Sequence, residues 1–300
     1  MEFKACNDLP ITGRVTKGEE NKTAIALFDG DIIVYRAGFA AEKREYFDSR
    51  NPPEEGGSSF STKKEALTEI KEVYLEYKRN LEPLANALQN AKGLIDNSLE
   101  DLKENHGVTV DNYMTFLSGN DQKPNFRLEI DPEYKANRDP AHKPTYIKEL
   151  VDYLVKNHKG FLTQGCEADD FFGHAQSDIT KQGLTPIIVS IDKDLKQLSG
   201  LHYNLVKREL TEVSPSEASI MFWRQMLEGD TIDNIKGIKG IGKARALKYL
   251  PDSTTDEQAK EIVIAHYKRD YANEWKEQYN KNCSLLWIWR RIPDECPHKV

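Results

Sequence analysis

The chain has 300 residues, enough for one large domain or two smaller ones with a substantial core. The net charge of −7 argues against a simple basic nucleic-acid coat protein but leaves room for a nucleic-acid enzyme with local basic patches. The four cysteines show no C-x-x-C spacing, which argues against structural zinc and favours a reducing compartment such as the cytoplasm. We see no apolar run of membrane-spanning length and no secretory signal.

Residues 1–22 are charged and contain Pro10, Gly13 and Gly18, which predicts a loosely ordered arm. A short apolar strand follows from Thr23 to Phe28 and stops at Asp29-Gly30-Asp31, before a helix that begins near Ile32. We therefore expect one or both of these acids to lie at the edge of a sheet.

The next segment, 48–59, is rich in proline and glycine and is predicted to be a loop. Within 61–104, apolar residues recur at steps of three and four, first up to Leu81 and again from Leu84. This spacing predicts two amphipathic helices with a break near Pro83, packed against the sheet or against each other.

A second strand is predicted from Tyr113 to Leu117, ending in a turn that contains Asp121. Aromatic and basic residues then alternate in Asn125-Phe126-Arg127 and in the stretch 134–138. Cations can meet phosphates and a ring can stack on a base, so this segment fits a nucleic-acid contact. The alternative is a solvated loop with ordinary surface charges. A further amphipathic helix is predicted over 146–158.

Two acidic clusters follow short apolar strands: Glu167-Ala168-Asp169-Asp170 after 161–163, and Asp192-Lys193-Asp194 after 186–191. A helix is predicted between them, over 171–181. Because sites in open α/β sheets collect at the carboxyl ends of strands, both clusters should face one crevice. Carboxylates this close repel unless a cation neutralises them, and oxygen ligands in such number suit magnesium or manganese. The alternative is a set of solvated turn and helix-cap acids.

After Asp194 we expect a strand over 202–206 and a helix over 216–227. Asp230 and Asp233 follow, three residues apart, and could share a helical face. The stretch 236–248 carries four lysines, one arginine and no acid, with glycines interleaved with isoleucines. A glycine turn that leads into a helix N-terminus can offer backbone N–H groups to a phosphate, as in a helix-hairpin-helix element. The remainder is predicted to be helical over 256–289.

Six motifs in this order resemble the flap endonuclease/5′→3′ exonuclease superfamily, most closely its compact bacteriophage members. They are Phe-Asp-Gly-Asp at 28–31, Asn-Phe-Arg at 125–127, Asp-Pro-Glu-Tyr-Lys-Ala-Asn-Arg at 131–138, and the acidic or glycine-rich motifs at 167–170, 192–194 and 229–242. The resemblance implies an α/β fold with a central, mostly parallel sheet flanked by helices, which is a PIN-like nuclease core. It also implies a helix-hairpin-helix DNA-binding element and C-terminal helices, giving a core over 23–228 with its helical segment 61–104, and a C-terminal part over 229–300.

The resemblance also implies residue roles. Two Mg²⁺ or Mn²⁺ ions would be held by Asp29, Asp121, Glu167, Asp169, Asp170, Asp192, Asp194, Asp230 and Asp233. Of these, Asp121 matches only loosely and Asp233 would be an outer ligand. Lys135 and Arg138 would act on the scissile phosphate. DNA contacts would come from Arg127, Tyr134, Lys236, Gly237, Lys239, Gly240, Ile241, Gly242 and Lys243, with K⁺ bound at the hairpin.

The implied activity is two-metal hydrolysis of phosphodiester bonds from the 5′ end of duplex DNA, extending to RNA–DNA hybrids or flaps. Partners would be DNA and replication proteins, with no membrane, in the cytoplasm of a phage-infected host. Only 28 residues separate Arg138 from Glu167, where the family places its arch, so flap threading is in doubt. Two alternatives stay open: a haloacid-dehalogenase-type phosphatase with Asp29 as nucleophile, and a catalytically silent structure-specific DNA-binding protein.

Overall fold

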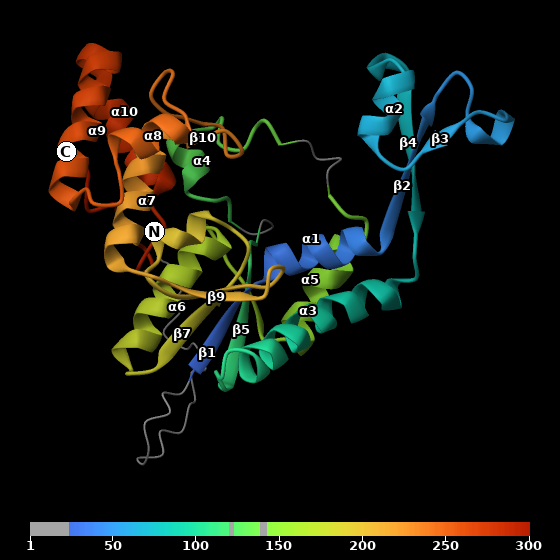
Figure 1. Cartoon of the computed structure of the whole chain (residues 1–300), viewed down its shortest axis with the longest axis horizontal. Helices are drawn as coiled ribbons and strands as arrows, with labels where there is room; N and C mark the ends of the chain where they lie inside the picture. The colour runs from blue at the N-terminus through green and yellow to red at the C-terminus, as the bar shows by residue number, and fades with distance from the viewer. Residues whose placement is uncertain (1–23, 120–122, 139–142) are drawn as a thin grey trace.

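The computed structural model describes residues 24–119, 123–138 and 143–300 (Figure 1). The predicted N-terminal arm over 1–22 and the predicted ligand Asp121 lie outside the described residues. Within the described part of the chain, no helix is both long and apolar enough to cross a membrane.

A six-stranded sheet forms the centre of the molecule, in the order β6-β5-β1-β7-β8-β9, with only β9 antiparallel to its neighbour. The strands are β1 Ala24–Asp29, β5 Val110–Leu117, β6 Gly160–Leu162, β7 Thr185–Val189, β8 Gly200–Asn204 and β9 Glu209–Val213. Strand β1 is buried along its whole length, as its unbroken apolar run requires for a strand covered on both faces. The predicted α/β fold with a mostly parallel sheet is confirmed.

Helices cover both faces of this sheet. Ala24, Ala26 and Phe28 of β1 point to one face, where they share a core with helices α1 Gly30–Ala40, α3 Leu84–Glu104 and α5 Ile147–Asn157. The alternate residues Ile25 and Leu27 point to the other face, which is covered by helix α6 Ala168–Lys181. The predicted helix after Pro83 is confirmed as α3, whose buried residues recur at helical spacing.

A second core lies in the C-terminal part, among α7 Pro215–Glu228, α8 Lys243–Tyr249, α9 Asp256–Tyr271 and α10 Trp275–Leu286. Between α7 and α8 the chain forms two short antiparallel strands, β10 Gly229–Asp230 and β11 Ile235–Lys236. The expectation that Asp230 and Asp233 share a helical face is therefore wrong, because Asp230 ends β10 and Asp233 lies in the turn that joins the two strands. A 3-10 helix, Asp194–Gln197, follows the second acidic cluster, and the short helix α4 Arg127–Ile130 packs against α10.

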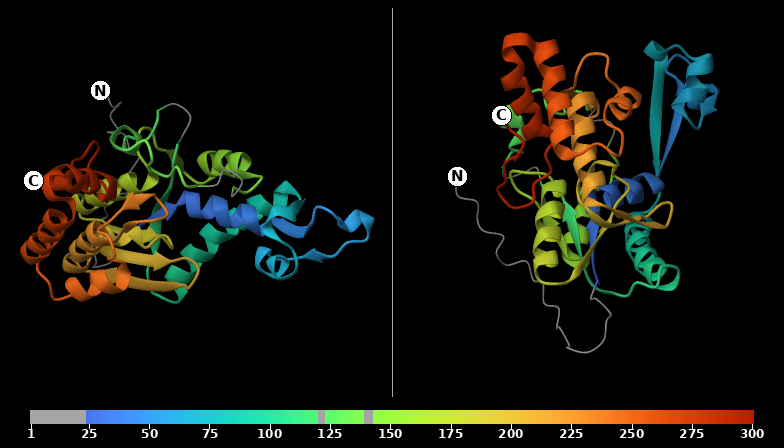
Figure 2. Two further views of the ribbon diagram at one scale, coloured as in Figure 1. Left: turned by 90° about the horizontal axis from the view of Figure 1, so that it is seen from above. Right: turned by 60° about the vertical axis from the view of Figure 1, so that its left-hand side comes forward.

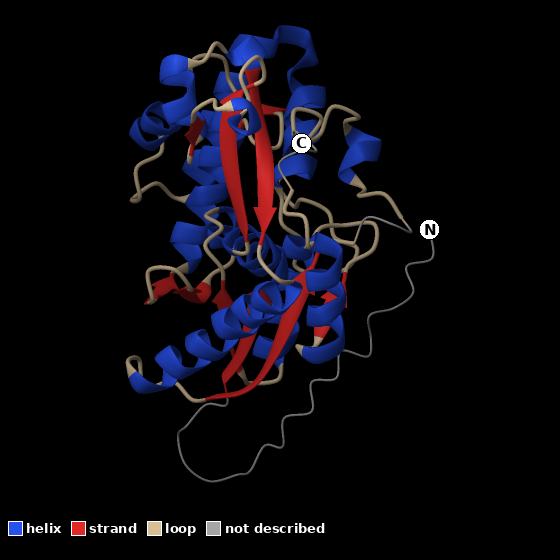
Figure 3. Cartoon of the chain, turned by 90° about the vertical axis from the view of Figure 1, so that its right-hand side faces the viewer, coloured by secondary structure: helices blue, strands red, loops and turns tan. Residues whose placement is uncertain are grey.

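Residues 42–81 form an arm that projects from the end of α1, and its long strands stand apart from the central sheet (Figures 1, 2 and 3). Its antiparallel sheet has the order β3-β2-β4, with β2 Glu42–Asp48, β3 Ser59–Phe60, β4 Leu75–Leu81 and the short helix α2 Lys63–Glu69. The predicted long helix over 61–81 forms only as α2, and it is wrong for 75–81, which form β4 after a 3-10 turn at Glu72–Tyr74. Tyr77 and Leu81 fit both the helical and the strand spacing, and pairing with the distant β2 selects the strand.

Candidate active site

The ends of three neighbouring strands bring two carboxylates and their hydrogen-bond donors to the same edge of the sheet. Asp29 ends β1 and caps α1, with Oδ1 accepting from the Ile32 N–H at 3.0 Å. Its Oδ2 accepts from the Ser190 hydroxyl at 2.6 Å, and Ser190 lies directly after β7. Asp31, in the first turn of α1, accepts from the Ser118 N–H at 3.1 Å, directly after β5. The carboxyl ends of β5, β1 and β7 thus meet in one polar patch.

The electrostatics of this edge are those of crowded, buried acids. Burial, together with the charges of Asp31 and Asp192, raises the pKa of Asp29 to about 7. Burial also raises the pKa of Asp31 and of Asp169, and for Asp169 the charges of Asp192, Asp29 and Glu167 add to the effect. Asp169 therefore interacts with both of the acidic clusters found in the sequence. For each of these acids the raised pKa means that ionisation is harder than for an exposed carboxyl, and nearby positive charge would favour the ionised form.

The second acidic cluster faces the turn between β10 and β11. Asp192 accepts from the Asp194 N–H at 2.8 Å, and Asp194 Oδ1 accepts from Gln225 Nε2 at 2.7 Å. Burial, together with the charges of Asp192, Asp230 and Asp233, raises the pKa of Asp194 to about 7. Asp230 is 7% exposed and accepts the N–H groups of its own turn.

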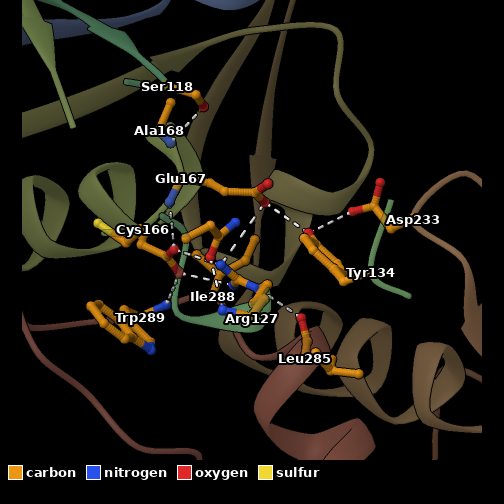
Figure 4. A network of polar contacts seen from close by, with 12 residues as sticks. Ser118, Arg127, Tyr134, Cys166, Glu167, Ala168, Asp233, Leu285, Ile288 and Trp289 are labelled. Atoms are coloured by element: carbon orange, nitrogen blue, oxygen red, sulfur yellow. Dashed lines mark hydrogen bonds and ion pairs between the residues drawn. The ribbon is translucent and has the colours of Figure 1, made fainter. Parts of the chain in front are cut away.

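Positive charge enters from the segment 131–138. Lys135 pairs with Glu167 and lies 3.5 Å from Asp233, while Arg138 donates to Asp233 at 2.6 Å. The Tyr134 hydroxyl lies 2.9 Å from both Glu167 and Asp233 (Figure 4). Although burial opposes it, Lys135 and then Arg127 lower the pKa of Glu167. These contacts join the loop to both carboxylate groups.

Lys135 has a backbone φ of 58°, in the left-handed region, and its N–H donates to the Asp233 carbonyl at 3.0 Å. This strained conformation is held by tertiary contacts, as is common where a side chain must be aimed at a site.

Two predicted roles for polar residues are wrong, because their side chains are fully engaged in the interior. Arg127 is 3% exposed and forms a two-pronged pair with Asp170, at 2.7 and 3.0 Å. Asp170 also accepts the N–H groups of Glu167 and Trp289, so its oxygens are saturated (Figure 4). Arg127 therefore cannot reach DNA, and Asp170 has no free lone pair for an ion.

Tyr134 is 4% exposed and packs in the C-terminal core, so its ring is not available to stack on a base. The prediction of a DNA-contacting ring is wrong, because the aromatic residue of this loop anchors it and its hydroxyl alone reaches the site.

In the glycine-rich turn, the residues predicted to touch DNA divide into exposed and packed ones. Ile241 is 6% exposed and Gly237 lies against the end of α7, where an added Cβ would be 2.3 Å from the Gly229 nitrogen. Gly240 has a φ of 77°, which favours glycine. The remaining residues predicted to contact DNA are exposed in or beside the turn; they are Lys236, Lys239, Gly240, Gly242 and Lys243.

A divalent metal ion needs several oxygen ligands around one point. Among the described residues, no three His, Cys, Asp or Glu side chains converge closely enough to hold one ion in their present rotamers. Lys135 and Arg138 instead occupy oxygens of Glu167 and Asp233. The donors are all carboxylate oxygens on one edge, and their pKa values are raised first by burial and then by the charges of neighbouring acids. This chemistry fits hard divalent cations.

Sequence reasoning missed several members of the site. Asp31 was left out of the predicted ligands, although its spacing of two from a strand-ending acid places it in the first turn of a helix at that edge. Ser118 and Ser190, which hold Asp31 and Asp29, directly follow strands and could have been found by the same rule. Gln225 lies inside α7, and nothing in its local pattern signals its contact with Asp194.

Comparison with known proteins gives two kinds of similarity. The family model "5′-3′ exonuclease, N-terminal resolvase-like domain" matches residues 97–221. DNA polymerase I of Chloroflexus aurantiacus is 30% identical over 177 residues, 51% of this chain and 18% of that protein. The 5′-3′ exonuclease of Mycoplasma pneumoniae is 28% identical over 185 residues, 56% of this chain and 61% of that protein. The chain thus spans less than two thirds of these relatives.

Among solved structures, a bacteriophage T5 protein co-crystallised with metal ions superposes with a TM-score of 0.53 at 15% identity, covering 88% of both chains. A bacteriophage T5 flap endonuclease in complex with DNA and metal ions gives the same TM-score, identity and coverage. At this identity the likeness concerns the fold, and it extends well beyond the region matched by the family model. Together with the six ordered motifs, these findings confirm that the chain resembles the flap endonuclease/5′→3′ exonuclease superfamily.

Proposed function

We propose that this chain is a magnesium- or manganese-dependent nuclease that hydrolyses phosphodiester bonds from the 5′ end of duplex DNA. The observation that carries the proposal is the meeting of acids from β1, α6, the end of β7 and the β10–β11 turn at one edge, opposite Lys135 and Arg138. The names of the relatives and the DNA and metal ions of the T5 complex support the same chemistry.

The residues divide into two groups of ligands. Asp29, Asp31, Glu167 and Asp169 would hold the first ion, and Asp192, Asp194 and Asp230 the second, with Asp233 outside them. When bound, the ions supply an activated water and stabilise charge on the attacking and leaving oxygens. The chain itself contributes Lys135 and Arg138, whose donors can exchange a carboxylate partner for the phosphate oxygens. The buried Tyr134 hydroxyl lies between Glu167 and Asp233 and can donate its one proton to either carboxylate.

The exposed lysines of the turn 236–243 would bind the phosphate backbone of the duplex. A K⁺ ion bound at this turn would also contact that backbone. Hybrids, flaps and RNA primers are further proposed substrates, and the similarity to DNA polymerase I supports work alongside replication proteins. Asp29 is 5% exposed and both of its oxygens accept hydrogen bonds, which argues against the covalent phosphatase alternative.

The test is digestion of end-labelled duplex, flap and hybrid substrates with Mg²⁺, Mn²⁺ or EDTA. We expect products released from the 5′ end only with a divalent ion. Asp192→Asn should lower cleavage by about a hundredfold or more, since two-ion stabilisation is worth several kcal/mol. Duplex binding should survive in this variant. Asp178→Asn, a surface acid of α6 paired with Lys181, is the control and should cleave normally. Cleavage in EDTA, or full activity of Asp192→Asn, would contradict the proposal.

A further inference from the structure

Residues 285–290, here called the C-terminal strap, form backbone hydrogen bonds with side chains in or beside both acidic clusters. They begin in the last turn of α10 and then continue without regular secondary structure to α6. Leu285, Ile288 and Trp289 are at most 5% exposed. The Trp289 ring stacks on Phe126 with 4.4 Å between centroids. Its carbonyl lies so close to Gly173 of α6 that an added Cβ would approach it to 1.9 Å. The strap is thus packed against the helix that carries Glu167 and Asp169.

A first polar relay joins the strap to the first acidic cluster. Arg127 donates to the carbonyls of Leu285 and Trp287, at 2.9 and 3.0 Å, while its other donors hold Asp170. Asp170 in turn accepts the Trp289 N–H and the Glu167 N–H, at 3.2 and 3.1 Å. Two side chains therefore tie three backbone positions of the strap to the start of α6 (Figure 4).

A second relay joins the strap to the second acidic cluster. Gln197 Nε2 donates to the Leu286 carbonyl at 2.8 Å and to Gln225 Oε1 at 2.6 Å. Gln225 Nε2 then donates to Asp194 Oδ1 at 2.7 Å. Both glutamines are 2% exposed, so water does not substitute for these partners.

The direction of this second relay is set by the strap. A carbonyl can only accept, so Leu286 requires the NH₂ end of the Gln197 amide, while the Ile288 N–H lies 3.4 Å from its oxygen. Gln197 then presents a second N–H to the oxygen of Gln225, which turns the NH₂ of Gln225 toward Asp194. Asp194 therefore receives an N–H donor because the Leu286 carbonyl orients the side-chain amides of Gln197 and Gln225.

We propose that the C-terminal strap positions both groups of metal-binding carboxylates, through Arg127–Asp170 on one side and Gln197–Gln225 on the other. The inference rests on the proposed function, since it assigns these four as positioning residues for the ligands named there. Groups that orient metal ligands commonly change metal affinity about ten- to a hundredfold when replaced.

The sharpest variant is Gln197→Glu, which keeps the shape but replaces the donating end of the amide with an acceptor. It removes the donor to Gln225, so Asp194 loses its imposed N–H. Gln176→Glu is the matched control: Gln176 is also a buried glutamine, 8% exposed, and donates to the Ser199 carbonyl outside either relay. Gln225→Leu provides a second break in the relay.

Mn²⁺ binding to the full chain, without nucleic acid, is measured by electron paramagnetic resonance, with Tm recorded for each variant. We expect the wild type to bind two ions, and Gln197→Glu and Gln225→Leu to weaken one of them about tenfold or more. Gln176→Glu should bind as the wild type does, even where its Tm falls similarly. If both relay variants bound Mn²⁺ as tightly as the wild type does, this inference would be overturned and the proposed function would stand. A wild type that binds no Mn²⁺ would overturn the proposed function as well.

Discussion

Asp170 and Asp29 are both buried carboxylates at the same edge of the sheet, yet they have opposite surroundings. Asp170 is met by the Arg127 guanidinium and two backbone N–H groups. Asp29 receives a hydroxyl and one N–H, while burial and the charges of the acids Asp31 and Asp192 raise its pKa. The negative charge of Asp170 is fully compensated within the protein, whereas Asp29 has no positively charged partner among these contacts. A buried acid of the second kind marks a place where a cation is expected from outside.

The same contrast separates the cations of the segment 125–138. The Arg127 side chain is 4% exposed and its pair with Asp170 is sealed in the interior, whereas the Arg138 side chain is 51% exposed and holds Asp233 at the surface. Both arginines are four or fewer residues from an aromatic ring in the sequence, so local pattern does not distinguish them. Burial decides which one supports the fold and which one is available to substrate.

The largest effect on stability is expected for Arg127→Met. Removing one partner of a buried ion pair leaves an uncompensated charge, at a cost of about 3–5 kcal/mol. Chemical denaturation at pH 7 measures this loss. Arg224→Met is the control, since Arg224 also bridges backbone and carboxylate but its partner Asp252 is exposed. If Arg127→Met lowered the free energy of unfolding by less than Arg224→Met does, the Arg127–Asp170 pair would not be the pair that stabilises the fold.

A smaller effect on stability, a gain in place of a loss, is expected for Asp29→Asn. Its pKa is about 7 in the folded chain and 3.8 as the ordinary value, so the folded state binds more protons between pH 4 and 7. The contribution of Asp29 to the free energy of unfolding of the metal-free chain is therefore present at low pH and is lost as the pH rises through that window. Asp29→Asn removes the penalty, and should be more stable relative to wild type at pH 8 than at pH 5.

Denaturation in EDTA at both pH values tests this, with Asp178→Asn as a surface control whose difference from wild type should not change in the same way. Adding Mn²⁺ should narrow the gap at pH 8, because the ion stabilises only the ionised wild-type site. An Asn variant that loses stability equally at both pH values would show that Asp29 has found sufficient compensation inside the protein.

Much of the fold followed from local pattern. The apolar runs that became β1, β5 and β7 and the helical spacing of α3 and α5 are signals carried by neighbouring residues. The arm was mispredicted because β4 exists through its pairing with β2, about thirty residues earlier, and its apolar spacing also suits a helix. Short segments of this kind are decided by long-range contacts that periodicity does not encode.

For the site, sequence reasoning found the acids because each follows the end of a strand, and parallel strands end on one edge. It could not assign the partners. Asp169 and Asp170 are adjacent and chemically identical, yet the helix turns Asp169 toward the carboxylates and Asp170 toward Arg127. Nor could it find Gln197 and Gln225, whose importance comes from the C-terminal strap folding back over the core.

The smallest effect on stability, with a large one on activity, is expected for Arg138→Met. Exposed ion pairs contribute about 0–1 kcal/mol, so unfolding should hardly change. If Arg138 releases Asp233 to act on the phosphate, cleavage should fall by about a hundred- to thousandfold. Arg269→Met is the matched control, because its side chain is similarly exposed, 56%, and pairs with Asp270 on α9. Equal cleavage by the two variants would place Arg138 with Arg127, as a residue of the fold and not of the chemistry.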